Sequence, residues 1–388
     1  MRTALTFMII ISRLIAGVIF IFSGFVKAVD PLGSTYKFID YFNAFQMPWL
    51  EPAAFFLALA LSTTEFTIGI CLIFFIQNRC ANWGALLFMS VFTPLTLWLA
   101  LTDPVHDCGC FGDAIILTNW QTFYKNILIL LVVIISFRYR NAVIRWVKLK
   151  TEWAITVITA FLITAFSLYN YHHLPVMDFR PYKIGTNISE KMKRPQGAPA
   201  NVYEQYFTLM DTVTGKVAEI ESKEYMADST YWGTHTTWKF IKSGEPVLIK
   251  QGYMPPIHDF TIESPTGNDI THEVLTDSGF YFIVIAYDLR KSNTKHQNKI
   301  TGLFKQAQAD GHKFIALTSS LEEDIAAFKS KWNIGYEFYL SDPITLKTII
   351  RANPGLLILH KGTILQKWNV NDLPSYQAVK RGYLYVEP

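Results

Sequence analysis

The segment His106-Asp107-Cys108-Gly109-Cys110-Phe111-Gly112-Asp113 is a short polar stretch between two long apolar runs, and the rest of the chain can be placed from it. Two of the chain's four cysteines stand here, one residue apart. Residues two apart can meet the Cα separation of a disulfide, roughly 4.4–6.8 Å. So small a ring stabilises a fold by only about 1.6 kcal/mol on the chain-entropy estimate. The spacing therefore favours a redox pair over a structural staple.

Two other roles for these cysteines stay open at this point. Free cysteines are often small buried hydrophobic residues, although the neighbours His106, Asp107 and Asp113 are polar. The same neighbours are possible metal ligands, but the familiar Cys-x2-Cys followed by a second ligand pair is missing. Metal binding is therefore less favoured here than a redox pair.

The backbone around the sulfurs is expected to be adaptable and to lead into a helix. Gly109 and Gly112 supply conformational freedom. Thr118 and Gln121 have the spacing of a capping box, which predicts the start of a helix. The thiols would then lie just ahead of a helix N-terminus, a setting that favours thiolate.

The apolar runs on both sides predict a membrane half followed by a soluble half. Hydrophobic residues make up 51% of the 388 residues and charged ones 17%, and the bias is concentrated before residue 170. The net charge of +4 is too small to indicate nucleic acid as a partner.

Five runs are long enough to cross a hydrocarbon core of roughly 30 Å, which makes the lipid bilayer a partner. They are Phe7–Val26, Pro52–Ile76, Trp83–Leu101, Trp120–Phe137 and Trp153–Tyr169. The first is too long for a signal peptide, and no cleavage site follows it.

The distribution of Lys and Arg predicts the orientation. Residues 138–150 carry five positive charges, which places this loop in the cytoplasm. Alternation then places the N-terminus inside, and the cysteine loop, the segment 31–51 and everything after Tyr171 outside. The expected location is a bacterial inner membrane with the C-terminal region in the periplasm, where disulfides persist.

Arg13 and Glu65 are ionisable residues inside the first two spans. Each would cost several kcal/mol alone at mid-bilayer, so each needs a partner or a wet cavity. Their depths, counted from the cytoplasmic ends of the runs, agree to within about a turn. We therefore expect the two side chains to pair beneath the cysteine loop, unless Arg13 extends to the inner interface instead.

Several motifs together resemble the DoxX-like membrane proteins, especially the methylamine-utilisation MauE branch, over about residues 5–140. These are Arg13-x3-Gly17, Ser23-Gly24-x2-Lys27, Glu65-x3-Gly69, Asp107-Cys-Gly-Cys-Phe-Gly-Asp113 and Phe123-x-Lys125-Asn126. The resemblance implies a four-helix membrane bundle with a redox-active pair, Cys108 and Cys110, on its outer side. It implies roles in disulfide formation in exported proteins or in quinone-linked sulfur chemistry. The supporting residues that it implies are Arg13, Lys27, Glu65 and Asn126. A fifth span and a large outer domain depart from the family's pattern.

The last third of the chain predicts an α/β domain. Strands are expected at 280–286, 312–318 and 336–340, helices at 300–309 and 322–332, and a hairpin from residue 355 through His360-Lys361-Gly362. Parallel strands joined by helices and followed by an antiparallel hairpin look like the thioredoxin fold. The segment 255–260 resembles the entry to the thiol peroxidase and cytochrome-maturation branches of that fold.

The predicted thioredoxin-like domain lacks the redox motif of that fold. Tyr287-Asp288-Leu289-Arg290-Lys291 stands where Cys-x-x-Cys is expected, and no cysteine follows Cys110. Pro354 would take the cis-proline position, whose neighbours hold extended substrate backbone in active relatives. We therefore expect this domain to bind a partner through the region of Pro354 and not to exchange disulfides itself.

The expected organisation has four parts. Residues 1–140 form the four-helix membrane domain, 141–171 the basic loop and fifth span, 172–250 an extended periplasmic region, and 251–388 the thioredoxin-like domain. The expected function is a thiol–disulfide redox protein that uses Cys108 and Cys110 and passes electrons to a quinone, with exported thiol-containing proteins as clients. The alternative is a membrane scaffold whose outer domain binds another envelope protein.

Overall fold

Long helices dominate the N-terminal half of the structure, a computed structural model that describes residues 2–105, 107–141, 146–250 and 252–384. In order they are α1 (Arg2–Val29), α2 (Pro31–Ala44), α3 (Ala54–Ile73), α4 (Asn78–Thr102), α5 (Asn119–Arg138) and α6 (Leu149–His172). Within the described residues, five helices are long and apolar enough to cross a membrane: all of these except α2, with the 3₁₀ turn Pro48–Ala53 extending α3. The five predicted spans are confirmed as membrane-length helices.

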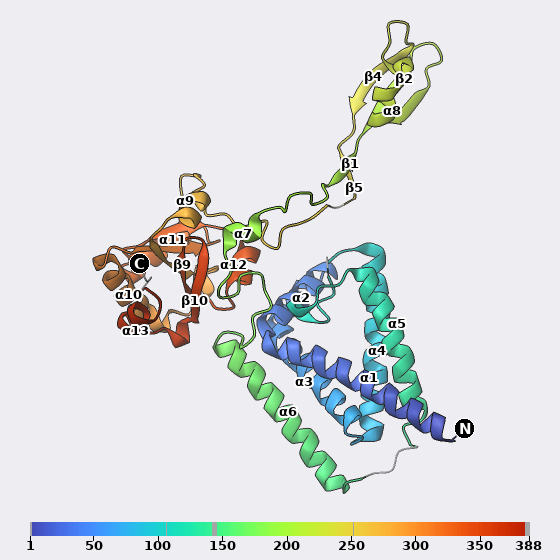
Figure 1. Ribbon diagram of the computed structural model, residues 1–388, viewed down its shortest axis with the longest axis vertical. Coiled ribbons are helices and arrows are strands. Elements are labelled where there is room, and N and C mark those ends of the chain that lie inside the picture. The colour runs from blue at the N-terminus through green and yellow to red at the C-terminus, as the bar shows by residue number, and fades with distance from the viewer. Residues whose placement is uncertain (1, 106, 142–145, 251, 385–388) are drawn as a thin grey trace. The chain divides into compact units, whose positions relative to one another are not determined.

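The bundle is built on a close contact between α1 and α3, which lie side by side in Figure 1. A Cβ added to Gly24 would lie 2.5 Å from the backbone nitrogen of Phe66, and one added to Gly69 would lie 2.6 Å from that of Ile21. Only glycine allows the two backbones to approach this closely. These contacts fix how far α1 is shifted along α3, and so decide which polar residues meet. α5 and α6 also pack on α1, and α4 packs on α3 and α5.

The helix α2 is not predicted by the sequence analysis, although the chain carries a start signal for it. Asp30 is the N-cap residue, its carboxylate accepts a hydrogen bond from the backbone of Gly33, and Pro31 follows at the first helical position. The helix places Lys37 and Tyr41 beside the cysteine loop. The predicted capping box that opens α5 is confirmed, with reciprocal hydrogen bonds between Thr118 and Gln121.

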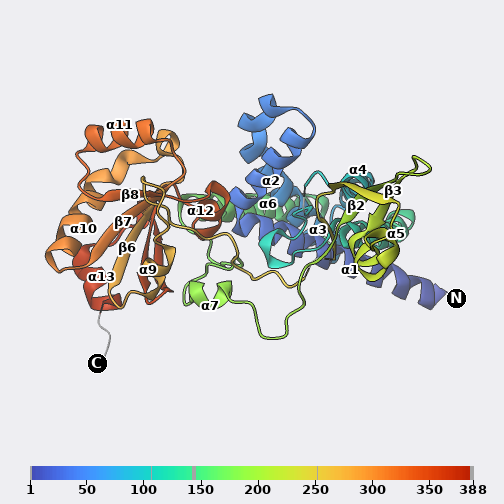
Figure 2. The same ribbon diagram turned by 90° about the horizontal axis from the view of Figure 1, so that it is seen from above.

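The C-terminal region is an α/β structure around a five-stranded sheet in the order β10-β9-β6-β7-β8. The strands are β6 (Phe280–Ile285), β7 (Lys313–Thr318), β8 (Glu337–Leu340), β9 (Gly355–His360) and β10 (Thr363–Asn369). β6, β7 and β8 run parallel and lie side by side in Figure 2, whereas β9 pairs antiparallel with both β6 and β10. The helices are α9 (Thr271–Thr276), α10 (Gln297–Ala309), α11 (Glu322–Trp332), α12 (Pro343–Ile349) and α13 (Tyr376–Tyr383).

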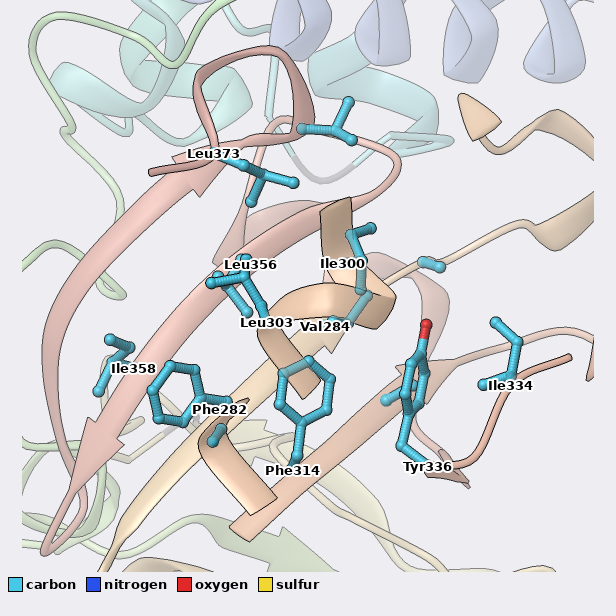
Figure 3. Packing of buried hydrophobic residues seen from close by; sticks show 14 of the residues in the cluster. Phe282, Val284, Ile300, Leu303, Phe314, Ile334, Tyr336, Leu356, Ile358 and Leu373 are labelled. Carbon is cyan, nitrogen blue, oxygen red and sulfur yellow. The ribbon is translucent and has the colours of Figure 1, made fainter. Parts of the chain in front are cut away.

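One face of this sheet packs on α10 and α13. Phe282 and Val284 of β6 are buried here together with Leu303 of α10 and Phe314 of β7 (Figure 3). Alternate residues of a strand point to the same face, so β6 directs these two side chains to one side and Ile283 to the other. The strands, the two long helices and the hairpin predicted for residues 280–369 are confirmed within a few residues at their ends. The short helices α9, α12 and α13 are additions.

Residues Asn187–Asp259 form a separate compact unit, and residues Met1–Thr186 with Phe260–Pro388 form the other. The smaller unit contains a two-stranded ribbon of β1 (Val202–Glu204) and β5 (Val247–Lys250). Its three-stranded sheet has the order β3-β2-β4, with β2 (Tyr206–Asp211), β3 (Val217–Glu221) and β4 (Trp238–Ser243). Two short helices, α7 (Ile188–Met192) and α8 (Ser222–Ala227), complete it. The strand and turn predicted from Tyr206 to Lys216 are confirmed.

Candidate functional site

The loop between α4 and α5 is held by side chains from the neighbouring helices. The carbonyl oxygen of Cys108 accepts a hydrogen bond of 2.7 Å from the Tyr41 hydroxyl of α2. That of Cys110 accepts hydrogen bonds from Ser23 Oγ at 2.7 Å and from Lys27 Nζ at 2.6 Å, both on α1. Both cysteine carbonyls are therefore fixed by residues outside the loop, which limits how the sulfurs can move.

Two glycines and one aspartate shape the loop itself. Gly109 and Gly112 have φ of +65° and +50°, a region that favours glycine. Asp107 Oδ1 accepts a hydrogen bond of 2.9 Å from the backbone nitrogen of Gly109, and Asp107 Oδ2 accepts one of 2.7 Å from Lys37 Nζ. The carboxylate thus connects the residue between the two cysteines to α2. His106 was predicted to support the site, and it lies outside the described residues.

The sulfur atoms of Cys108 and Cys110 are 2.9 Å apart, and both residues are free thiols in this structure. The hydrogen bond with the Cys108 sulfur and the positive charges of Lys125 and Lys27 lower the pKa of Cys110 to about 6 despite burial. The same hydrogen bond and burial raise the pKa of Cys108. Of the two thiols, Cys110 is therefore the one that ionises more easily.

A buried ion pair lies beside the loop. Lys27 Nζ is 2.9 Å from Glu65 Oε2 and 3.2 Å from Oε1, and donates a further bond of 2.7 Å to Ser23 Oγ. The two residues are only 6% and 3% exposed. Because Lys27 also bonds the Cys110 carbonyl, the pair connects α1 and α3 to the redox loop.

The predicted pairing of Arg13 with Glu65 is wrong. Arg13 Nη1 instead donates a 2.6 Å hydrogen bond to Asn78 Oδ1, and its guanidinium lies 5.1 Å from the ring centroid of Phe75. Arg13 and Lys27 are fourteen residues apart on α1, about 21 Å along the axis, so they cannot share Glu65. The close contact of α1 with α3 puts Lys27 at the level of Glu65 and Arg13 at the end of α3. Arg13 is therefore remote from the cysteine pair.

The two cysteines line a largely apolar cavity of about 320 Å³ inside the helical bundle. Lys27, Glu65, Lys125 and Asn126 also line it. Its aromatic walls come from α1, α2, α4 and the loop: Phe20, Phe38, Tyr41, Phe42, Phe45, Phe88, Phe92 and Phe111. A volume above about 300 Å³, mostly apolar walls and a few convergent polar groups are typical of a small-molecule site.

Lys125, which was not predicted as a site residue, and the predicted residues Phe111, Gly112 and Asn126 line the same cavity or stabilise its wall. Lys125 Nζ lies 4.1 Å from the ring centroid of Phe111, a cation–π contact. Asn126 Nδ2 donates to Thr96 Oγ1 at 3.2 Å, linking α5 to α4. A Cβ on Gly112 would lie 3.1 Å from Val26, so the loop packs closely on α1 here.

The outer side of the loop is bound to the C-terminal region through Arg351. Its guanidinium donates to both carboxylate oxygens of Asp30, at 3.1 and 2.8 Å, and Nη2 is 3.1 Å from Asp113 Oδ2. Burial raises the pKa of Asp113, and the positive charge of Arg351 opposes that rise. Arg351 comes shortly before the cis Asn353–Pro354 bond, which confirms the predicted cis geometry at Pro354.

The segment that begins at Tyr287, where the sequence analysis expects a Cys-x-x-Cys motif, lies close to the Pro354 loop and to α2. The Tyr287 hydroxyl is 3.1 Å from that of Tyr36, and the amide of Asn353 donates to the Asp288 carbonyl at 2.7 Å. The Asn353 carbonyl accepts a 2.8 Å bond from the backbone of Asn293. This backbone bond ties the Pro354 loop to the segment that follows Tyr287.

Four residues of the site are absent from the sequence prediction: Lys37, Tyr41, Asp30 and Arg351. A signal existed for the first two, because the Asp30-Pro31 start predicts a helix whose polar residues would face the outer loop. No sequence signal relates Arg351 to Asp30, which is 321 residues away. The structure brings Cys108, Cys110, Lys27, Glu65 and Asn126 to one cavity and leaves Arg13 outside it.

Comparison with known proteins gives one finding for the membrane part. Residues 5–138 match the family model described as Methylamine utilisation protein MauE. This range includes α1 to α5, with the cysteine loop, and covers about a third of the chain. No curated protein and no solved structure matches.

Proposed function

We propose that the chain is a multi-pass membrane thiol–disulfide redox protein whose Cys108 and Cys110 cycle between two thiols and a disulfide. The observation that carries this proposal is the pair of free thiols, 2.9 Å apart, on the wall of a largely apolar cavity beside a buried Lys27–Glu65 pair. A role in packing alone requires neither the ion pair nor the lowered pKa of Cys110. The match of residues 5–138 to the MauE model supports membership of the membrane part in that group.

The chemistry follows from the unequal pKa values of the two sulfurs. In the oxidised form, a substrate thiolate attacks Cys108, the Cys108–Cys110 bond breaks, and Cys110 leaves as the more stable thiolate. The second substrate thiol, as its thiolate, then attacks the mixed disulfide. This releases an oxidised substrate and leaves Cys108 as a thiolate that takes up one proton. Two electrons have then passed from the substrate to the pair, and the other substrate proton goes to water because Cys110 stays a thiolate. Lys27 and Lys125 stabilise the Cys110 thiolate throughout.

Reoxidation of the pair needs an acceptor of two electrons and two protons, and a quinone bound in the cavity would supply that chemistry. The cavity fits such a group, because its aromatic walls suit an apolar ring and the ammonium group of Lys125 can donate to a carbonyl oxygen. Glu65, in contact with Lys27, is the carboxylate on the cavity wall that can hold a proton during the transfer.

The proposed location is a bacterial inner membrane with the cysteine loop and the C-terminal region in the periplasm. The support is charge: residues 138–150 carry five positive charges, and this segment follows α5 at the end opposite the cysteine loop. An alkaline phosphatase fused after Pro388 should be active and one fused after Lys148 inactive. The reverse result would place the cysteines in the reducing compartment and overturn the proposal.

The proposed fold of residues 260–388 is thioredoxin-like. The support is the parallel β6-β7-β8 arrangement, the antiparallel β9-β10 hairpin and the cis-proline that leads into β9. With Tyr287 at the position of the missing cysteine motif, this region contributes binding and not thiol exchange. Exported proteins with exposed thiols are the proposed clients of the membrane pair.

A redox titration in membranes tests the function. Free thiols are blocked with a mass-tagged maleimide while the ambient potential is varied, and the number of tags on the chain is counted. Two tags should be lost together as conditions become oxidising, and Cys110→Ser should abolish this paired change. A pair that stays reduced under every condition would overturn the proposal.

A membrane accessory protein is the second candidate. The observation in its favour is the unit Asn187–Asp259, in which several large apolar side chains are exposed: Val213, Met226, Trp232, Phe240 and Ile249. Exposed apolar surface of this kind is typical of protein interfaces. A Cys108→Ser/Cys110→Ser variant that replaces the unmodified protein in the cell without loss of function would favour this accessory role.

A further inference from the structure

Two cavities reach the cysteine loop from different sides. The first is the apolar cavity of about 320 Å³ described above. The second is an outer chamber of about 230 Å³ between α2, the loop and α12. Several charged side chains line it, among them Asp30, Asp40, Asp113 and Arg351, whereas the first cavity has mainly apolar walls.

Lys37 stands between the two cavities and lines both, together with Ser34 and Gly109. Its aliphatic chain lies directly on the backbone between the cysteines, since a Cβ on Gly109 would come within 2.9 Å of Lys37 Cγ. Its ammonium group is held by Asp107 Oδ2 at 2.7 Å. The same carboxylate accepts a 2.9 Å hydrogen bond from the Gly109 nitrogen, so Asp107 connects the Lys37 ammonium group to the backbone between the cysteines.

We propose that Lys37 is the barrier between two entrances to the cysteine pair, an apolar one through the bundle cavity and a polar one through the outer chamber. The apolar entrance admits the electron acceptor. The polar entrance admits hydrophilic thiols, either small molecules or a narrow peptide segment, since Arg351 and α12 cover the chamber and a folded protein surface does not fit in about 230 Å³. This assignment of reactants rests on the proposed redox function.

The barrier can open because the ion pair between Lys37 and Asp107 is partly exposed to water. The side chains of Lys37 and Asp107 are 30% and 27% exposed, and partly exposed ion pairs are screened by water and salt. The buried Lys27–Glu65 pair on the other side of the loop is held by several hydrogen bonds and stays closed. A hydrophilic reactant that offers its own charge to Asp107 can therefore displace the Lys37 ammonium without disturbing the bundle.

The test measures how fast two thiol reagents consume the free thiols of the reduced pair in the full chain, reconstituted in lipid vesicles. One reagent is a positively charged methanethiosulfonate, which is confined to water, and the other is N-phenylmaleimide, which enters apolar cavities. Lys37→Ala should raise the rate with the charged reagent at least about tenfold and change the rate with the apolar reagent less than twofold. Asp107→Asn, which releases the Lys37 ammonium group, should also raise the rate with the charged reagent.

Lys37→Arg is the matched control, because it preserves the charge and the contact with Asp107, and it should behave like the unmodified chain. Charged-reagent rates that are equal in all variants would overturn the barrier while leaving the redox function intact, since the apolar reagent still reports a reactive pair. A pair that reacts with neither reagent in any variant would overturn both proposals.

Discussion

The buried Lys27–Glu65 pair offers the sharpest test of how the membrane bundle holds the cysteine loop. Lys27→Met removes the ammonium group and leaves the Glu65 carboxylate in a site that is 3% exposed. Breaking a buried pair from one side costs about 3–5 kcal/mol. Glu65→Leu leaves Lys27 with Ser23 and the Cys110 carbonyl as partners. This variant should therefore lower the free energy of unfolding by about 3 kcal/mol, the lower end of that range.

The double variant separates an interaction from two independent losses. Replacing both members leaves no unpaired buried charge, so Lys27→Met/Glu65→Leu should lose less than the sum of the single variants by about 2–3 kcal/mol. The free energy of unfolding would be measured in mixed micelles by denaturing-detergent titration, followed by circular dichroism.

Arg13 supplies the matched control, because it is also a buried cation of α1 but contacts Asn78 and Phe75 instead. Arg13→Met combined with Glu65→Leu should be additive within about 0.5 kcal/mol. Additivity for Lys27 with Glu65, or coupling for Arg13 with Glu65, would refute the assignment of the pair.

Two further predictions concern the loop. The alkylation rate of Cys110 by iodoacetamide should rise with pH around a midpoint near 6, because the lowered pKa leaves the thiolate present above that pH, and Lys125→Met should move the midpoint upward. A midpoint near the ordinary thiol value, about 8.5, would contradict the hydrogen bond from Cys108. Arg351→Gln should increase hydrogen exchange in residues 343–354 at least about tenfold without affecting α1, since it leaves Asp30 and Asp113 without their shared cation. Unchanged exchange there, measured by mass spectrometry, would show that Arg351 does not hold this segment.

The sequence predicts the membrane helices and the central strands because each has a local signal. Twenty apolar residues in a row indicate a span whatever the partner helices are, and a continuous apolar strand such as Phe280–Ile285 indicates a buried sheet. The short helix α12 carries a similar local signal in Asp342-Pro343, which the sequence analysis does not use. Secondary structure was therefore within reach of the sequence in most of the chain.

The candidate site depends on distances that no local pattern contains. The pairing of Arg13 with Glu65 was inferred from the ends of two apolar runs, and these ends do not lie at one depth. The actual register is set by the contacts of Gly24 and Gly69 with the facing backbone, which bring Lys27 to Glu65. The glycines were visible in the sequence, but which residue each one faces follows only from the packed helices.

Charge balance explains why three ionisable side chains occur beside one cysteine. Lys27 and Lys125 favour the thiolate of Cys110, and Glu65 opposes it. Glu65 neutralises Lys27, which allows that pair to stay buried in the bundle and leaves one positive charge, that of Lys125, on this part of the cavity wall. When Cys110 ionises, the group of four becomes neutral, so the thiolate is the counter-ion of Lys125. The two lysines thus have different tasks: Lys27 fixes the loop to the helices, and Lys125 adds to the hydrogen bond with Cys108 in favouring the Cys110 thiolate.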